Sequence, residues 1–436
     1  MKKIGASARK FLWTSPFVLP FTLFLIHMSW TKNTELAHKS ELWSYEKLID
    51  LVQTPSQRLP IVVVDFGNSF RKTRTDSTDM TKLAALLDVV AEQDPLAIGV
   101  DVRFGATDLR RGIYPDGQDQ VVNKATDLRA EGIKVFLTVN EGLGNPDSTT
   151  WLGTPDLRFR ANPNKEVNPK TSEFVAHALV PKVETGGHFT LFNAIQIPGS
   201  GVTVPSLAGA LADEYRKKHH LSETQRGSWL LEAYAEPVEE QGTLGSRTTL
   251  FPASVYYLNY SALGRLKDET IDVGDDGQLL LTPRKDLPPA KSIFIIGSAD
   301  PSRDPAPGPH GDPGGLYLHA LGAYTLLFAP LYALTFWPRL IVDAFLMAGL
   351  LLVNSKLESR LETKRPMGAP TLGLLAGSLT AMVVCTLFGV ALARLWGIIW
   401  TDWIVILIIL WIDFVVHVAF EAIKKDQPKS EQIAQH

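Results

Sequence analysis

Four long apolar runs set the main limits on how this chain can fold. One lies near the start, at about residues 11–30, and three lie near the end, at about residues 338–353, 370–388 and 398–420. A helix of roughly 18–25 apolar residues crosses the hydrocarbon core of a bilayer, and these runs reach or approach that length. The sequence therefore predicts four transmembrane helices, one N-terminal and three C-terminal, with a large domain between the first and the second.

The basic residues that flank the runs predict the orientation of the chain. Lys and Arg are frequent in residues 1–10, in the loop between the second and third runs, and in residues 421–436. Short segments rich in these residues stay in the cytoplasm. We therefore expect a bacterial inner-membrane protein whose large domain is periplasmic. A cleaved signal peptide is the alternative for the first run, but its apolar stretch is longer than a usual signal core.

The expected domain order follows from these runs. Residues 1–10 form a cytoplasmic N-terminus, 11–30 the first transmembrane helix, 31–337 a periplasmic domain, 338–420 a three-helix transmembrane region and 421–436 a cytoplasmic tail. Since the tail is short, we expect no catalytic domain after the last helix. The large domain is long enough to bury its own core.

Charge and cysteine content exclude several classes of function. The formal net charge is −3, so no strong attraction to nucleic acid or anionic lipid is expected from the whole chain. The single cysteine, Cys385, falls inside the third apolar run. The periplasmic domain therefore has no disulfide, no thiol nucleophile and no cysteine-ligated metal site.

The first half of the large domain has the pattern of an α/β fold. Short apolar strands are predicted at residues 61–65, 96–101 and 134–139. Between them lie one helical pattern with an apolar stripe of Leu83, Leu86, Leu87 and Val90 and another at 119–131. Ser77 or Thr78 is the expected cap of the first of these helices. A further strand is predicted at 292–296, and a helix that begins near Leu318 leads towards the membrane. We expect a mainly parallel sheet with flanking helices and right-handed crossovers.

Two other segments between these elements need an interpretation. Residues 140–168 are rich in Gly, Pro and Asn, which predicts a long insertion or loop over the sheet. The run Lys217–His220 ends a predicted helix at 206–217. A metal site is one reading of the two histidines, but cations at the C-terminus of a helix offset the helix dipole, and that second reading is favoured.

Two aspartates mark a candidate ligand site. Asp65 and Asp101 each end a buried strand, and ligands of open α/β sheets bind beyond the carboxyl ends of the strands. The two carboxylates could hold Mg²⁺ or accept hydrogen bonds from a polar ligand. Arg103 follows closely and could pair with either acid. The plainer interpretation is that each aspartate stabilises a turn or a helix start, or pairs with Arg103.

Ser298 and His319 complete the candidate ligand-binding residues. Ser298 follows Gly297 at the end of the predicted strand 292–296, where backbone N–H groups could surround an anion; a tight turn is the simpler reading. His319 stands at the start of an apolar helix, where a histidine is more often a hydrogen-bonded packing residue than a ligand or a base. The chain has no Walker or GxGxxG sequence, no HExxH and no Ser/His/Asp spacing typical of a catalytic triad.

Ionisable residues within the C-terminal apolar runs are candidates for interactions inside the membrane. Asp413 and His417 are four residues apart and share a helix face. Such groups are unfavourable in a bilayer unless they have a partner. We expect them to pair with a neighbouring helix or with another subunit, and a proton relay is the alternative. Asp343 is placed near the outer end of its span, and Asp402 at the membrane interface.

Four passages of the large domain have a shared pattern with one group of sensory domains. They are an opening strand with an acidic end, an apolar-Asp-apolar-x-Phe stretch, an Asn-aromatic strand end, and a strand-Gly passage with an Asp-Pro loop and a Gly-x-x-x-His-Ala ending. In this sequence they are Ile61–Ser69, Ala97–Phe104, Tyr257–Tyr260 and Ile293–Ala320. In these passages, over roughly Leu36–Phe328 and in the three spans that follow, the chain resembles the CHASE2 family of extracytoplasmic sensory domains.

The resemblance implies a sensor, with two departures. Arg71–Asp79 stands where the family often has a Trp/Pro-rich stretch, and residues 421–436 stand where many members continue into an effector. We expect a sensor without its own effector, which binds an unknown periplasmic ligand and relays the signal to a protein partner or a second copy. No cofactor, metal, nucleic acid or enzymatic activity is expected. The alternatives are a membrane-anchored metal-dependent hydrolase that uses Asp65 and Asp101, and a structural scaffold of an envelope complex.

Overall fold

The computed structural model describes part of the chain, in two compact units. The described residues are 45–49, 58–72, 77–102, 117–139, 149–151, 158–160, 175–177, 190–196, 203–221, 231–232, 238–241, 247–280, 289–302, 306–309, 311–334, 337–350, 369–400, 402 and 406. Val52–Ala333 forms one unit, here called the sheet unit. Met1–Leu51 and Leu334–His436 form the other, here called the apolar-helix unit.

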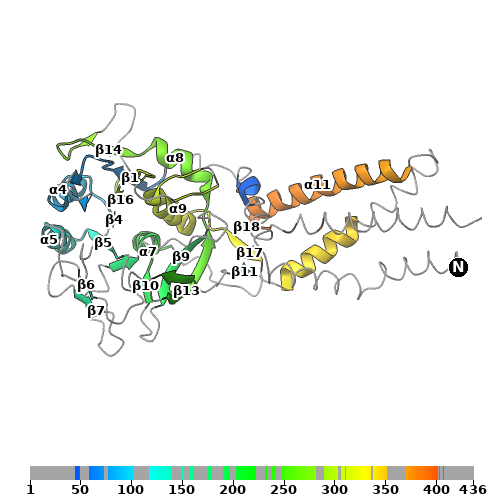
Figure 1. The fold of residues 1–436 in the computed structure, drawn as a ribbon, viewed down its shortest axis with the longest axis horizontal. Helices are drawn as coiled ribbons and strands as arrows, with labels where there is room; N and C mark the ends of the chain where they lie inside the picture. Colours follow the sequence, from blue (N-terminus) through cyan, green and yellow to red (C-terminus); the bar gives the residue numbers. More distant parts are fainter. Residues whose placement is uncertain are drawn as a thin grey trace, which may run out of the picture. The chain divides into compact units, whose positions relative to one another are not determined.

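The sheet unit contains a seven-stranded, mainly parallel sheet (Figure 1). Its strand order is β15-β14-β1-β16-β4-β5-β8. Only β15 runs antiparallel to its neighbour, β14. The α/β fold class expected from the sequence is thereby confirmed for this unit. The strands are β1 (Ile61–Asp65), β4 (Ala97–Asp101), β5 (Lys134–Val139), β8 (Val175–His177), β14 (Ile271–Val273), β15 (Leu279–Leu280) and β16 (Ile293–Gly297).

The C-terminal strand β16 lies between β1 and β4, which the helical crossover α4 connects in the sequence. All five residues of β16 pair in parallel register with β1 on one side and with β4 on the other. Asp65, Gly297 and Asp101 therefore stand in one row across the sheet. Because register partners point to the same face of a sheet, the two aspartate side chains lie on the same face.

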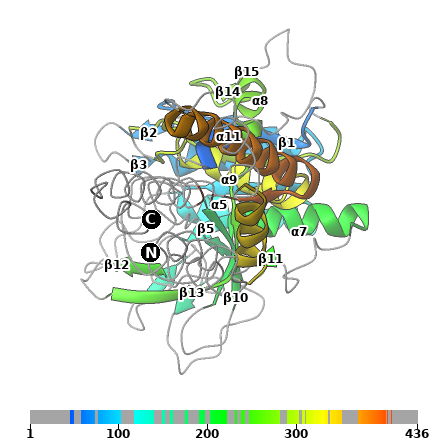
Figure 2. The same cartoon turned by 90° about the vertical axis from the view of Figure 1, so that its right-hand side faces the viewer.

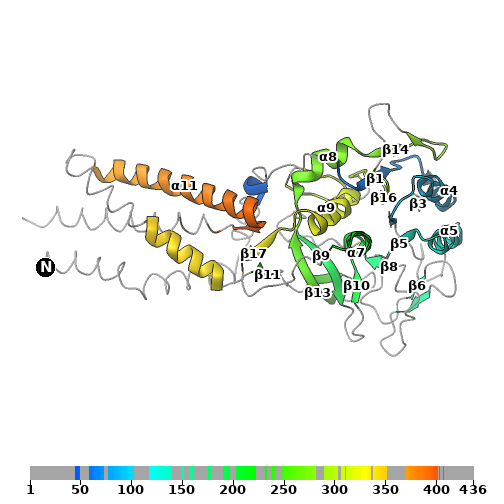
Figure 3. The ribbon, with the colours of Figure 1, turned by 180° about the vertical axis from the view of Figure 1, so that it is seen from behind.

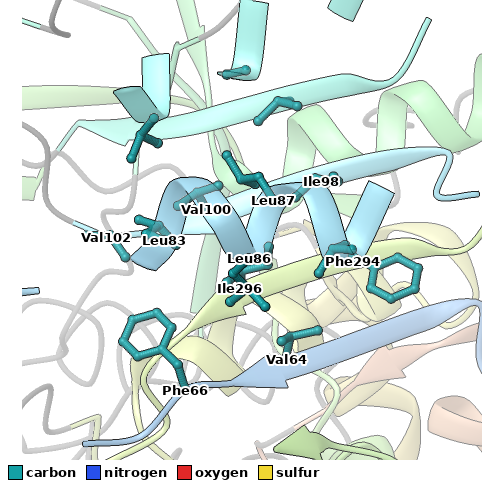
Figure 4. Close-up of a cluster of buried hydrophobic side chains, with 14 of the residues drawn as sticks. Val64, Phe66, Leu83, Leu86, Leu87, Ile98, Val100, Val102, Phe294 and Ile296 are labelled. Atoms are coloured by element: carbon teal, nitrogen blue, oxygen red, sulfur yellow. The ribbon is translucent and has the colours of Figure 1, made fainter. Parts of the chain in front are cut away.

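Helices cover both faces of this sheet (Figure 1). Alternate residues of each strand point to opposite faces. One set packs with α4 (Met80–Ala91) and α5 (Gln118–Ala130) into a buried core, part of which Figure 4 shows. The other set faces α7 (Leu207–His219) and α9 (Gly315–Leu327). The strand residues of the core in Figure 4 are Val64, Ile98, Val100, Phe294 and Ile296.

The helix caps follow from the sequence in one case and differ from the expectation in another. The Ser206 hydroxyl accepts a hydrogen bond from the Gly209 N–H, 2.9 Å away, and caps α7. For α4, the prediction of Ser77 or Thr78 as the cap is wrong. The side chain of Asp79 accepts the Thr81 N–H at 3.1 Å instead, because Ser77–Thr78 forms strand β3, which pairs with β2 (Arg71–Lys72).

A second sheet and several short elements complete the sheet unit. The order β10-β9-β13-β12 makes a four-stranded antiparallel sheet, whose strands can be followed in Figures 2 and 3. Within the segment predicted to be a long insertion or loop, β6 and β7 pair as an antiparallel ladder, which agrees with an insertion rather than with a loop alone. The remaining bounds are β6 (Thr149–Trp151), β7 (Arg158–Arg160), β9 (Thr190–Gln196), β10 (Thr203–Pro205), β11 (Leu231–Glu232), β12 (Val238–Gln241), β13 (Arg247–Tyr257), η2 (Tyr260–Ala262), α8 (Leu263–Asp268) and β17 (Tyr332–Leu334).

The apolar-helix unit contains α11 (Ala369–Trp396) and a helix at residues 337–350. Of the helices in the described residues, α11 alone is long and apolar enough to cross a membrane, over Leu379–Trp396. The run predicted as the fourth span begins differently from the expectation, because Ile398–Ile399 is strand β18. The first run, residues 11–30, lies outside the described residues.

Candidate functional site

The carboxyl ends of β1, β16 and β4 form the candidate site. Asp65 and Asp101 flank Gly297 there, each in register with it. Neighbouring strands are about 4.8 Å apart, so the Cα atoms of the two aspartates are separated by roughly 10 Å. Asp272 on β14 extends the row on the other side of Asp65. The predicted grouping of the aspartates at one sheet edge thus matches the register, although each carboxylate has its own contacts.

The carboxylate of Asp65 holds two turns together. Its Oδ1 atom accepts hydrogen bonds from the Gly67 N–H at 2.7 Å and from the Ala299 N–H at 2.9 Å. Gly67 belongs to the turn after β1, and Ala299 follows β16. Since two backbone donors already bind this oxygen, the observed role of Asp65 is to join the ends of two neighbouring strands.

Asp101 has a different partner, the imidazole of His319 on α9. The Asp101 Oδ1 atom lies 3.5 Å from His319 Nε2, and the two side chains are 11% and 4% exposed. A carboxylate and an imidazole this deeply buried stabilise each other, because either group would lose its hydration without compensation if it stood alone. The pairing of an aspartate with Arg103 remains a prediction, because Arg103 lies outside the described residues.

Helix α9 passes over the middle of the row because Gly297 leaves room for it. A Cβ atom on Gly297 would lie 2.8 Å from Leu316 Cδ1 and 3.1 Å from the Asp101 carbonyl oxygen. The first contact is with the end of a flexible side chain and the second is with backbone, so an added Cβ would need Leu316 to turn away and β4 to shift slightly. Gly297 therefore leaves the space in which Leu316 of α9 lies close to the end of β16.

Tyr317 lies on the same helix and contacts the other end of the row. Its hydroxyl forms a 2.9 Å hydrogen bond with the Thr270 hydroxyl. Burial raises the pKa of the Tyr317 phenol, the Thr270 hydrogen bond opposes the rise, and the negative charges of Asp65 and Asp272 add to it. The first turns of α9 thus carry a phenol and an imidazole that face the carboxylates of the row. Sequence reasoning missed Tyr317, although it stands inside the Gly-x-x-x-His-Ala passage.

Ser298 belongs to the turn after β16. Its hydroxyl donates to the Gly67 carbonyl oxygen and accepts from the Asp300 N–H, both at 3.4 Å. The first bond connects the same two turns that Asp65 joins, and the second lies within the turn after β16. They agree with the tight-turn interpretation of Ser298 rather than with a cradle for an anion.

Among the residues that the structure describes, no group of three or more His, Cys, Asp or Glu could hold a metal ion. Of the predicted site residues, Asp65, Asp101, Ser298 and His319 come together at the ends of three neighbouring strands. The pairing of Asp413 with His417 remains a prediction, because both lie outside the described residues.

The C-terminal end of α9 is held by buried polar contacts as firmly as its start. Arg216 on α7 donates to the Leu326 carbonyl oxygen at 2.5 Å. The Asn259 N–H donates to the Thr325 hydroxyl at 2.8 Å, and the Asn259 side-chain amide donates to the Ala329 carbonyl oxygen at 3.3 Å. Asn259 is the asparagine of the Asn-aromatic passage, and its place in that passage was the sequence signal for this role.

A second buried polar group lies in the apolar-helix unit. Arg339 binds both carboxylate oxygens of Asp402, whose side chain is 1% exposed. The indole N–H of Trp400 donates to Asp343 Oδ1 at 2.8 Å, and within the described residues Asp343 Oδ2 has no hydrogen-bond partner. The prediction that Asp402 lies at the membrane interface stays a prediction; within its unit the buried Asp402 carboxylate is paired with the partly exposed Arg339. Arg339, one turn before Asp343 in an apolar run, was the overlooked signal.

Comparison of the chain with protein-family models, with curated proteins and with solved structures gave no match.

Proposed function

We propose that this protein is a membrane-anchored extracytoplasmic sensor, of the kind that its resemblance to the CHASE2 family implies. The observation that carries the proposal is the position of α9 in the chain, between the carboxyl edge of the sheet and the segment that leads to the apolar helix. At its start, α9 holds His319 against Asp101 at the carboxyl edge of the sheet. At its end, the same chain continues through Tyr332–Leu334 into the apolar helix at residues 337–350.

The topology of the sheet unit gives this helix the geometry of a relay. The chain enters β1 at its amino end, and α9 runs back from the carboxyl ends of the strands towards their amino ends. A helix of 13 residues is about 20 Å long. A ligand that binds at the carboxyl edge and changes the Asp101–His319 contact therefore acts on a rigid element whose other end leads to the apolar helices.

Membrane anchoring is supported by the apolar runs and by side chains that the fold leaves exposed. On α11, Leu379 and Leu387 are 66% and 64% exposed, and Phe345 on the helix at residues 337–350 is 77% exposed. Large apolar side chains at such exposure are typical of lipid-facing helices. With the basic segments on the cytoplasmic side, the sheet unit is periplasmic. Asp413 and His417 are then the proposed contacts to a protein partner or a second copy.

Reporter fusions test the orientation. Fusions after Gln53 and Ser302 should report a periplasmic position, and fusions after Leu361 and Gln427 a cytoplasmic one. The reason is that the basic segments alternate with the apolar runs. A cytoplasmic report at Ser302 would overturn the proposal.

A labelling experiment tests the relay itself. Phe345→Cys in a Cys385→Ala background places one spin label on the helix at residues 337–350, in the full chain reconstituted in nanodiscs. If α9 is a relay, Asp101→Asn and His319→Gln should both change the mobility of the label. Gly264→Ala on α8, where an added Cβ meets no atom within 4 Å, is the control and should not. Identical spectra for all four proteins would contradict the relay.

A further inference from the structure

The C-terminal ends of α7 and α9 form an exposed patch that the proposed sensing site does not use. The two helices end side by side, because Arg216 near the end of α7 donates to the Leu326 carbonyl oxygen near the end of α9. The patch, here called the helix-end patch, consists of Tyr215, Lys218, His219, His220, Leu221 and Phe328.

Aromatic and apolar side chains make the helix-end patch continuous. The Tyr215 ring lies between the His219 ring, at a centroid distance of 4.2 Å, and the Phe328 ring, at 5.8 Å. Phe328 is 41% exposed and Leu221 is 47% exposed. Both residues follow the ends of α7 and α9, so two large exposed apolar side chains lie at these helix ends beside polar groups.

The charge of the patch comes from its exposed polar residues. Arg216 and Lys217 are each paired with an acid one turn earlier, Asp213 and Glu214. Lys218, His219 and His220 are exposed. A lysine ammonium and imidazole N–H groups are donors that suit phosphate oxygens. The formal net charge of the chain is −3, so this attraction to anions is local to the patch.

The chain connects the patch to the apolar helices through a short segment. Phe328 is the C-terminal cap of α9, and fewer than ten residues separate it from Trp337, where the helix at residues 337–350 begins. A fully extended connection of that length spans at most about 35 Å. Side chains that combine exposed aromatic or aliphatic groups with cations are typical of the boundary between headgroups and acyl chains.

We propose that the helix-end patch binds anionic phospholipid headgroups of the membrane that holds the apolar helices. Lys218 and the two imidazoles donate hydrogen bonds to lipid phosphates, while Phe328 and Leu221 lie against the upper acyl region. The inference rests on the proposed membrane anchoring. It adds a surface of the sheet unit that recognises lipid charge and holds the end of α9 at the membrane.

The test uses the full chain in nanodiscs. Leu221→Cys in a Cys385→Ala background carries one fluorophore, and a fraction of the lipids carries a quencher at the headgroup. We expect strong quenching in discs that contain phosphatidylglycerol and weak quenching in discs of phosphatidylcholine alone. High salt should reduce the difference, because it screens exposed charges. Leu280→Cys on β15, a leucine with 51% exposure outside the patch, is the matched control and should respond to neither lipid.

Lys218→Glu separates charge recognition from simple proximity. Near an anionic surface one lysine contributes roughly a five-fold change in the binding equilibrium, so the reversal should weaken docking by that factor or more. The thermal unfolding of this variant should differ only slightly from that of the parent, because Lys218 is exposed and the interaction of one exposed cation with the helix dipole is weak.

Three results would overturn the inference. Equal quenching in both lipids would mean that headgroup charge is not recognised. No quenching, with Ser302 fusions still reporting a periplasmic domain, would reject the patch and leave the proposed sensor standing. If the fluorescence of the label depended on whether a disc holds one or two copies of the chain, and not on lipid charge, the patch would be a self-association surface.

Discussion

The Asp101 Oδ1 atom on β4 lies 3.5 Å from the His319 Nε2 atom on α9, and both side chains are nearly excluded from solvent. The contact joins the carboxyl end of a central strand to helix α9 of the same unit. It is therefore both a stabilising contact and the point at which an event at the sheet edge can act on α9.

Breaking this contact should destabilise the sheet unit. Leaving a buried polar partner unsatisfied costs about 1–3 kcal/mol, so His319→Leu should lower the free energy of unfolding by about that amount. Asp101→Asn keeps one acceptor oxygen and should lower it by less. Urea unfolding of the full chain in detergent measures it. Asp272→Asn, an exposed carboxylate in the same row, is the control and should change stability by less than about 0.5 kcal/mol. The double variant with Asp101→Asn and His319→Leu completes the comparison. If its loss of stability equalled the sum of the two single losses, the two residues would not be coupled.

Asp65 should be sensitive to the loss of its acceptor oxygen rather than of its charge alone. Asp65→Ala removes the acceptor for two backbone N–H groups, and we expect a loss of about 2–4 kcal/mol if both become unsatisfied. Asp65→Asn keeps one acceptor oxygen and should cost clearly less. The two variants are compared by their urea midpoints. Equal losses would assign the role of Asp65 to charge.

Gly297 should not tolerate a side chain, whereas Gly264 should. Gly297→Ala places a Cβ atom 2.8 Å from Leu316 Cδ1, and overpacking of this kind costs about 1–3 kcal/mol. Gly264→Ala, within α8 and without atoms near the added Cβ, should leave stability unchanged or raise it by about 0.5–1 kcal/mol. Thermal unfolding of both proteins in one detergent is the measurement. A neutral Gly297→Ala would mean that α9 lies further from the sheet.

Tyr317 should contribute to a loss of stability at alkaline pH. Burial raises the pKa of its phenol, with Asp65 and Asp272 adding to the rise, so the folded chain holds this proton more tightly than the unfolded chain. That part of the stability is present below the ordinary tyrosine pKa of 10.0 and is lost as the pH rises through the folded-state value. Stability measured from pH 8 to pH 11 should fall less steeply for Tyr317→Phe than for the parent.

The tyrosine prediction has an internal comparison. Burial also raises the pKa values of Tyr260 and Tyr324, so Tyr317→Phe should reduce the alkaline slope without abolishing it. Its stability at neutral pH should fall by about 0.5–1.5 kcal/mol, because the hydrogen bond to Thr270 is lost. If the curves of stability against pH for Tyr317→Phe and the parent were parallel, Tyr317 would not be one of the titrating groups.

The ion pair of Arg339 and Asp402 should be more sensitive to single than to double substitution. Asp402→Leu removes the carboxylate that the partly exposed Arg339 binds, and the loss of hydrogen bonds to a charged group costs about 1.5–3 kcal/mol. Replacing both residues, with Arg339→Met and Asp402→Leu, removes the charge imbalance and should recover much of that loss. The melting temperature in detergent ranks the three proteins. A double variant as unstable as Asp402→Leu would mean that the pair is not a closed unit.

Local patterns predicted the individual elements well. The apolar run 61–65 and the run 134–139 are β1 and β5 with the expected bounds, because short continuous apolar runs suit strands buried on both faces. The cap Ser206 and the cations at the end of α7 were also predictable, because capping depends on residues within one turn. The cap of α4 was not, since Ser77 and Thr78 are used in a strand pair.

The sequence by itself determined which segments are apolar, which faces of the helices are buried and that the chain carries runs long enough for a membrane. Only the tertiary structure decided that β16 lies between β1 and β4, and hence that Gly297 separates Asp65 from Asp101. It also decided that Asp101 meets His319. The physical reason is that hydrophobic periodicity specifies the face that a residue occupies but not the strand or helix beside it. That neighbour is chosen by packing between segments far apart in the chain, here by the close approach of Leu316 to a glycine.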